Sequence, residues 1–293
     1  MQGTRLRYLD VYKGILMLMV IYGHIVYAIA LYADGYTNAT YQWFQTVAND
    51  WVAPYYMAAF FIVTGYCMFR TKPFKKQIID DLRRLIVPGL IMPVLLLPLS
   101  LSDFDFSDFL KKIFLHGGGY WFIIALFISK LQYSLLCKWV RSPLRWFILA
   151  ASMMLGSYFV ENKIFEIWSL YHAMVMIIFL EVGSALRKYD LLNRRLALIG
   201  AVSLALYLLL TLVYHMIGWG MPAFCAIQTY YWKLVFMYFL FAVSGSMVLL
   251  WAAKWIEHCH WLEYVGKNSL IYYLVHFSFF GLFIPWIKDY VVY

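Results

Sequence analysis

The sequence is poor in charged residues, poor in cysteine and free of segments that would link separate domains. Charged residues make up 13% of the 293 residues, whereas soluble globular domains carry about 25%, so the deficit excludes an ordinary soluble protein. The four cysteines show no paired spacing; we therefore expect neither a disulfide framework nor a bound metal, and we expect the cysteines to pack as small apolar side chains. No linker, repeat or low-complexity stretch is visible, which predicts a single domain over residues 1–293.

What the chain has instead is apolar and aromatic residues, at 64% and 20% of the sequence. Runs long enough to cross about 30 Å of hydrocarbon occur at 11–32, 51–69, 85–101, 120–139, 144–160, 164–186, 196–218, 230–253 and 268–287. Prolines interrupt the run 85–101 and precede the run 144–160, but spanning helices tolerate proline where neighbours satisfy the freed backbone groups. The sequence therefore predicts an all-α, polytopic transmembrane helical bundle of about nine or ten spanning helices.

The net charge of +9 is distributed as a membrane protein requires. Of the 24 lysines and arginines, 18 fall on one side of the predicted membrane, and Lys130 lies inside a span. The other side holds only Lys111, Lys112, Lys163, Lys233 and Lys288. By the positive-inside rule the N-terminus is cytoplasmic. The basic excess thus reflects topology and does not indicate a nucleic-acid partner; we expect a multi-pass protein of the plasma (inner) membrane, surrounded by its lipids.

The first span carries Lys13 and His24, and Asp10 lies directly before it; ionisable residues on a membrane-spanning helix indicate a functional site by default. Lys13 and His24 are eleven residues apart, which is about three helical turns, so they share a face and lie roughly 16 Å apart. A cation at the rim and an imidazole in the interior suit an elongated anionic ligand. Other roles stay open: Lys13 extending to lipid headgroups, His24 bonding a neighbouring helix, and Asp10 either pairing with Lys13 or capping the helix.

Six stretches resemble the acyltransferase 3 family of integral-membrane O-acyltransferases, in the order that the family shows. They are LDVYKGILMLMVIYGH at 9–24, FFIVTGYCMFR at 60–70, RRLIVP at 83–88, YWFIIALF at 120–127, FLEVGSALRK at 179–188 and GKNSLIYYLVH at 266–276. The basic position of the first stretch is usually arginine, whereas Lys13 followed by Gly14 is similar to the sugar O-acetylase branch that includes fucose 4-O-acetylases. A further arginine expected three residues before Arg84 is replaced by Asp81.

The resemblance implies transfer of an acyl group, most often acetyl from cytosolic acetyl-CoA, to a hydroxyl of a cell-surface glycan or glycolipid precursor. Acyl-CoA is then a donor substrate, and no cofactor is permanently bound. Phosphates of the coenzyme suit Lys13, Arg70, Arg83 and Arg84, which lie where the first three spans begin or end on the cytosolic side. Burial should keep His24 neutral at pH 7 and able to act as a base.

We therefore expect His24, with Lys13 and Asp10, to form the catalytic group. Deprotonation of the acceptor hydroxyl by His24 competes with a covalent acyl-histidine relay. His276 and Trp121 lie in family motifs and are candidates for the pocket, although Trp121 is also a typical interface anchor. Glu181 and His172 fit better as hydrogen-bond partners between helices. The alternative function is that of a carrier or flippase for a lipid-linked or acylated solute, because intramembrane ionisable residues also mark transport pathways.

Overall fold

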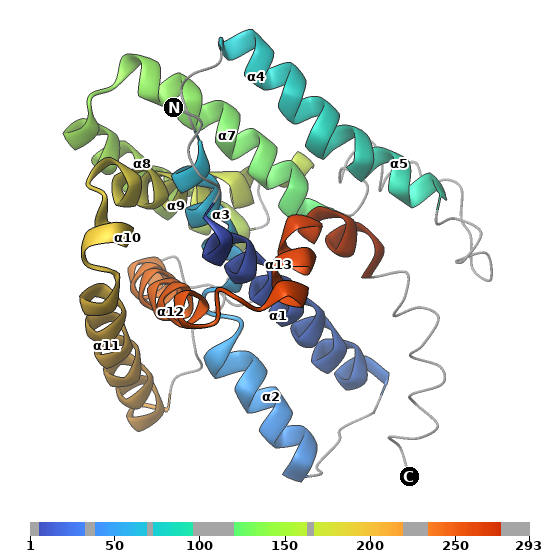
Figure 1. Cartoon of the computed structure of the whole chain (residues 1–293), viewed down its shortest axis with the longest axis vertical. Coiled ribbons are helices and arrows are strands. Elements are labelled where there is room, and N and C mark those ends of the chain that lie inside the picture. Colours follow the sequence, from blue (N-terminus) through green and yellow to red (C-terminus); the bar gives the residue numbers. More distant parts are fainter. Residues whose placement is uncertain are drawn as a thin grey trace. The chain divides into compact units, whose positions relative to one another are not determined.

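A computed structural model describes residues 6–32, 39–68, 73–95, 120–162, 167–218 and 234–276, and every regular element in these ranges is helical (Figure 1). Six of the helices are long and apolar enough to cross a membrane. They are α1 (Arg7–Tyr32), α7 (Trp121–Trp139), α8 (Ser142–Glu161), α9 (Leu170–Lys188), α11 (Leu196–Met216) and α12 (Val235–Trp255). The prediction of an all-α polytopic helical protein is confirmed.

The other three predicted spans coincide with shorter helical segments. The span predicted at 51–69 is the 12-residue helix α3 (Tyr56–Cys67), which begins after Pro54 because proline cannot donate a helical hydrogen bond. The span predicted at 85–101 is helical up to Leu95, through a π-helical turn η1 (Leu82–Ile86) and α5 (Val87–Leu95). The span predicted at 268–287 is helical over 269–276. The remaining residues of the last two spans lie outside the described ranges.

The chain forms two compact units. The first unit comprises Met1–Phe60, Asn193–Ala226 and Met237–Tyr293, and the second comprises Phe61–Leu192 and Ile227–Phe236. The division falls inside α3, inside the short helix α10 (Leu191–Arg194) and near the start of α12. Each unit is described below by itself.

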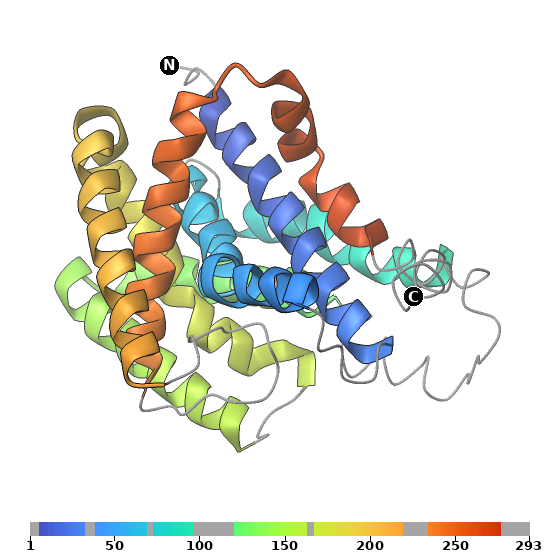
Figure 2. The same cartoon turned by 90° about the horizontal axis from the view of Figure 1, so that it is seen from below.

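In the first unit, α1 packs along α13 (His260–Lys267), so that the two ends of the chain's described sequence meet (Figures 1 and 2). α12 lies close to α1 as well, since the buried Tyr12 hydroxyl donates to the carbonyl oxygen of Ser246 at 3.3 Å. Gly200 lets α11 approach α12, because a Cβ there would lie 2.5 Å from the ring of Trp251. Glycine at such crossings is typical of helices that pack within a membrane.

In the second unit, α9 packs against both α7 and α8. Eleven of its residues are buried, which makes α9 the central helix of this unit. Serine hydroxyls tie the neighbours to its backbone: Ser129 of α7 donates to Ala173 and Ser152 of α8 donates to Met174, each at 3.0 Å. The first unit also contains the short helix α2 (Ala39–Trp51), and the second contains α4 (Phe74–Asp81) and the 3₁₀ turn η4 (Ile167–Ser169) before α9.

Candidate functional site

Helix α1 places the three residues that the sequence singles out. The helix is continuous from Arg7 to Tyr32, so Lys13 and His24 do keep the helical spacing of roughly 16 Å along the axis. Lys13 Nζ forms an ion pair with Asp10 Oδ1 at 2.7 Å, and Asp10 is only 3% exposed. Of the two expected roles of Asp10, pairing with Lys13 is therefore the one observed. The ammonium group is positioned by a carboxylate one helical turn before it.

Two glycines bring α13 against the same face of α1. A Cβ added to Gly266 would lie 1.7 Å from the backbone oxygen of Asp10, and a Cβ added to Gly14 would lie 2.2 Å from the backbone oxygen of Leu262. No side chain larger than hydrogen fits at either position without separating the helices. The first and last family-like motifs of the sequence are thus in direct backbone contact, at the level of Asp10 and Lys13.

A cluster of ion pairs lies beside this contact, at the N-terminal end of α1. Arg7 Nη2 lies 3.0 Å and Lys267 Nζ 2.5 Å from the carboxylate of Glu263, whose residue is 8% exposed. The hydrogen bond from Lys267, followed by the one from Arg7, lowers the pKa of Glu263 below its ordinary value of 4.5. Glu263 is therefore ionised at neutral pH and joins α13 to the start of α1.

The helical segment that follows α13 brings His276 to His24. The two imidazole centroids are 4.9 Å apart in an edge-to-face arrangement, and His276 is 4% exposed whereas His24 is half-buried. His24 Nδ1 lies 2.8 Å from the carbonyl oxygen of Val20, and His276 Nδ1 lies 2.6 Å from that of Tyr273. A carbonyl oxygen only accepts, so each Nδ1 carries the proton and donates it. In each neutral ring, Nε2 is therefore the nitrogen with a lone pair.

The sequence suggested His24 and His276 separately, and the structure brings them together. Arg83 and Arg84 belong to the second unit, where both are exposed on the π-helical turn η1. Trp121 is in the second unit too, and its ring lies 4.4 Å from that of His172. Arg70 lies outside the described residues.

Asp81, which replaces an arginine of the family pattern, has a structural partner. Its carboxylate forms an ion pair with Lys130, the lysine that the sequence placed inside a span. Both side chains are largely buried, at 14% and 15% exposure. A lone ammonium in the hydrocarbon region is costly, so the pair accounts for both residues and ties α4 to α7.

A buried polar cluster of the second unit was only partly anticipated. Glu181 accepts hydrogen bonds from Arg145 Nε at 2.7 Å, from Arg145 Nη2 at 2.8 Å and from the Tyr133 hydroxyl at 2.6 Å. The expectation that Glu181 bonds neighbouring helices is confirmed, but Arg145 was not expected to be buried. Arg145 is the fourth residue of α8, at the cytosolic rim where positive charge is common, so its place in the sequence did not reveal that it pairs with a buried carboxylate. In the first unit, His215 pairs with Asp50 at 2.8 Å, which nothing in the sequence indicated.

Comparison with known protein families gives a match over almost the whole chain. A family model described as an acyltransferase domain matches residues 6–292, so the match includes Lys13, His24, the arginines of η1 and His276. Neither a curated protein nor a solved structure matches the chain.

Proposed function

The chain belongs to the acyltransferase 3 family and is a multi-pass membrane acyltransferase, and on that premise we propose that it transfers acetyl from acetyl-CoA. The acceptor is a hydroxyl group of a cell-surface glycan or glycolipid precursor, and the protein acts in the plasma membrane as a sugar O-acetylase. The arrangement of His24 with His276 supports this proposal best, because it provides a lone pair on a fixed imidazole beside a second imidazole.

His24 acts as the general base in this proposal. Its Nδ1 proton is held by the carbonyl oxygen of Val20, so Nε2 accepts the proton of the acceptor hydroxyl while the hydroxyl oxygen attacks the thioester carbonyl. The C–S bond then breaks, and the coenzyme leaves as a thiolate that takes up the proton. A positioned general base contributes typically about 10²- to 10⁴-fold. Val20 stabilises the imidazolium that forms, because the carbonyl dipole points at Nδ1–H.

His276 acts as a positioning residue for His24. Its ring packs edge to face at 4.9 Å and restricts the rotation of the His24 imidazole about its side chain. If both rings were cationic, they would repel each other by about 3 kcal/mol at an effective dielectric constant of about 20. The pair therefore binds one proton more readily than two, and the proton taken from the acceptor is readily passed on.

Phosphates of the donor bind on the cytosolic side in this proposal. We assign the diphosphate next to the pantetheine arm to Lys13, which Asp10 holds at the rim of α1, and to Arg70, Arg83 and Arg84. Arg83 and Arg84 are exposed on η1, and phosphate favours the charge-assisted hydrogen bonds that such cations donate. π-Helical turns recur at functional sites, which agrees with two adjacent exposed arginines on η1.

The test is turnover of purified wild-type protein and its His24→Ala variant with radiolabelled acetyl-CoA, a soluble glycan acceptor and a thiol reagent that detects free coenzyme. We expect thiol release from the wild type and a loss of at least about 100-fold in the variant. A carrier releases no thiol, so absence of release from the wild type would overturn the proposal. Turnover of His24→Ala at the wild-type rate would remove His24 from the mechanism. Mass spectrometry of surface glycans from cells with and without the protein identifies the acceptor.

A further inference from the structure

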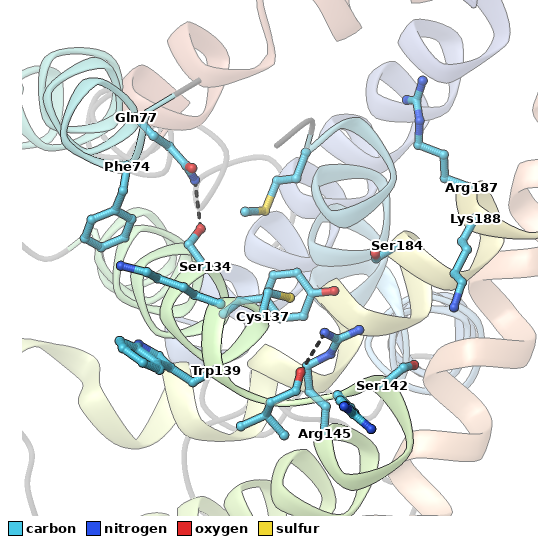
Figure 3. Close-up of a pocket in the computed structure, with 15 residues that line it drawn as sticks. Phe74, Gln77, Ser134, Cys137, Trp139, Ser142, Arg145, Ser184, Arg187 and Lys188 are labelled. Atoms are coloured by element: carbon cyan, nitrogen blue, oxygen red, sulfur yellow. Dashed lines mark hydrogen bonds between the residues drawn. The ribbon is translucent and has the colours of Figure 1, made fainter. Parts of the chain in front are cut away.

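The second unit contains a large pocket whose charge is one-sided. Its volume is about 1060 Å³, and its fifteen lining residues come from α4, α7, α8, α9, the turn between α7 and α8, and Met68 directly after α3 (Figure 3). Five of the lining residues are lysine or arginine, and none is aspartate or glutamate. Ligand pockets measure about 300–1,000 Å³, so this one is large enough for a nucleotide-sized molecule.

Three of the five cations are exposed, namely Lys138, Arg141 and Lys188. Arg145 is neutralised by Glu181, which accepts two hydrogen bonds from it. Arg187 is half-buried and donates to the Tyr66 carbonyl oxygen at 3.1 Å. In a chain with only 13% charged residues, this concentration on one pocket favours a polyanionic ligand. The positive-inside rule places the end of α7, the start of α8 and the end of α9 at the cytoplasmic side.

Aromatic side chains line the wall of the pocket that lies opposite Arg187 and Lys188. Trp139 is 77% exposed and Phe74 is 39% exposed. Figure 3 shows both on one side of the pocket, with Arg187 and Lys188 on the other. Lys138 Nζ lies 5.2 Å from the Trp139 ring centroid, so a cation is already placed beside the exposed ring. Aromatic faces stack on nucleobases and lysine or arginine contacts phosphates, whereas a lipid headgroup has no planar ring to stack.

The walls of the pocket are held in place by hydrogen bonds. Gln77 of α4 donates to the Ser134 hydroxyl at 3.0 Å, and the Asp81–Lys130 ion pair ties the other end of α4 to α7. Arg145 Nη1 also reaches the carbonyl oxygen of Val140 at 3.4 Å, which fixes the turn between α7 and α8. The cations therefore project from a preformed frame.

We propose that this pocket binds the nucleotide end of the acyl-CoA donor, with the base on Trp139 and the 3′-phosphate of the ribose on Lys138, Arg141 and Lys188. The inference rests on the proposed function, because it assumes that acyl-CoA is the donor. It assigns the nucleotide to residues outside the six motifs that indicated the family, except for Lys188 at the end of the fifth.

The experiment compares wild type with the triple variant Lys138→Ala, Arg141→Ala, Lys188→Ala, in which every substituted side chain is exposed, so that folding is retained. Arg195→Ala, an exposed cation that does not line the pocket, is the matched control. We expect the triple variant to raise KM for acetyl-CoA at least tenfold with little change in kcat, and the control to leave both unchanged. S-Acetylpantetheine lacks the nucleotide, so wild type and triple variant should use it with equal efficiency.

Two further arms separate the sources of phosphate. Adenosine 3′,5′-bisphosphate should inhibit the wild type competitively with acetyl-CoA and should lose this effect at least tenfold in the triple variant. If instead the triple variant keeps the wild-type KM but loses a dependence of activity on phosphatidylglycerol in vesicles, the pocket binds lipid and the inference is wrong. Thiol release by the wild type with an unchanged KM in the triple variant also overturns the inference while leaving the proposed function intact. No release by the wild type overturns both.

Discussion

Replacing Gly266 by alanine tests whether the backbone contact between α1 and α13 sets the geometry of the two histidines. The added Cβ would lie 1.7 Å from the Asp10 carbonyl oxygen, where ordinary contact begins at 3.4 Å, so the two backbones must separate by about 1.7 Å at a crossing that requires a small residue. His276 lies ten residues after Gly266, on the helical segment that follows α13. We therefore expect His276 to be displaced together with α13. A displacement of about 1 Å in a catalytic arrangement can cost about 10²-fold in rate, so we expect turnover to fall by about that factor.

The matched control is Gly23→Ala, on α1 and directly beside His24. A Cβ there meets nothing within 4 Å, and alanine in a helix interior is favoured over glycine by roughly 0.5–1 kcal/mol. Thiol release measured on equal amounts of folded protein should therefore be near wild type for Gly23→Ala and about 100-fold lower for Gly266→Ala. Equal activity of the two variants, with unchanged unfolding temperatures, would refute the idea that this glycine contact positions His276 against His24.

Two further predictions concern charged pairs. Glu181→Gln leaves the buried Arg145 without a carboxylate and should lower the free energy of unfolding by about 3–5 kcal/mol; Glu257→Gln, which breaks the surface pair with Lys254, should cost at most about 1 kcal/mol. If denaturant titrations gave similar losses of unfolding free energy for the two variants, the stabilising role of the buried Arg145–Glu181 pair would be contradicted. The pKa of Glu263 is lower in the folded protein than in the unfolded chain. The ionised Glu263 therefore stabilises the folded state at pH values above the ordinary carboxyl pKa, and this stabilisation is lost as the pH falls through the pKa of the folded protein. The unfolding temperature should thus be steady near neutral pH and drop below about pH 4.5, with a shallower drop in Glu263→Gln; identical acid profiles would rule out this role.

Hydropathy and helical spacing were enough to predict the helical class and the placement of Lys13 and His24 on one helix, because both depend on local sequence. The pairing of His24 with His276 depends on Gly14 and Gly266, and a glycine in an apolar run does not reveal which backbone it contacts. The 12-residue length of α3 was missed because hydropathy averages across Pro54. The pocket was missed for another reason: the positive-inside rule explains each of its cations singly, so their convergence on one cavity was visible only in three dimensions.

The hydrogen bonds of the two histidines also distinguish the two chemical routes. An acyl group on Nε2 of His24 would leave Nδ1 protonated, because the Val20 carbonyl oxygen accepts a hydrogen bond but cannot remove the proton. The relay would thus pass through a cationic acyl-imidazolium, 4.9 Å from a second imidazole that cannot then be protonated without repulsion. The base route creates the same single positive charge only while the hydroxyl proton is in transit, and it discharges that charge when the coenzyme thiolate takes the proton. Direct transfer with His24 as base is therefore the route that this arrangement of donors and acceptors favours.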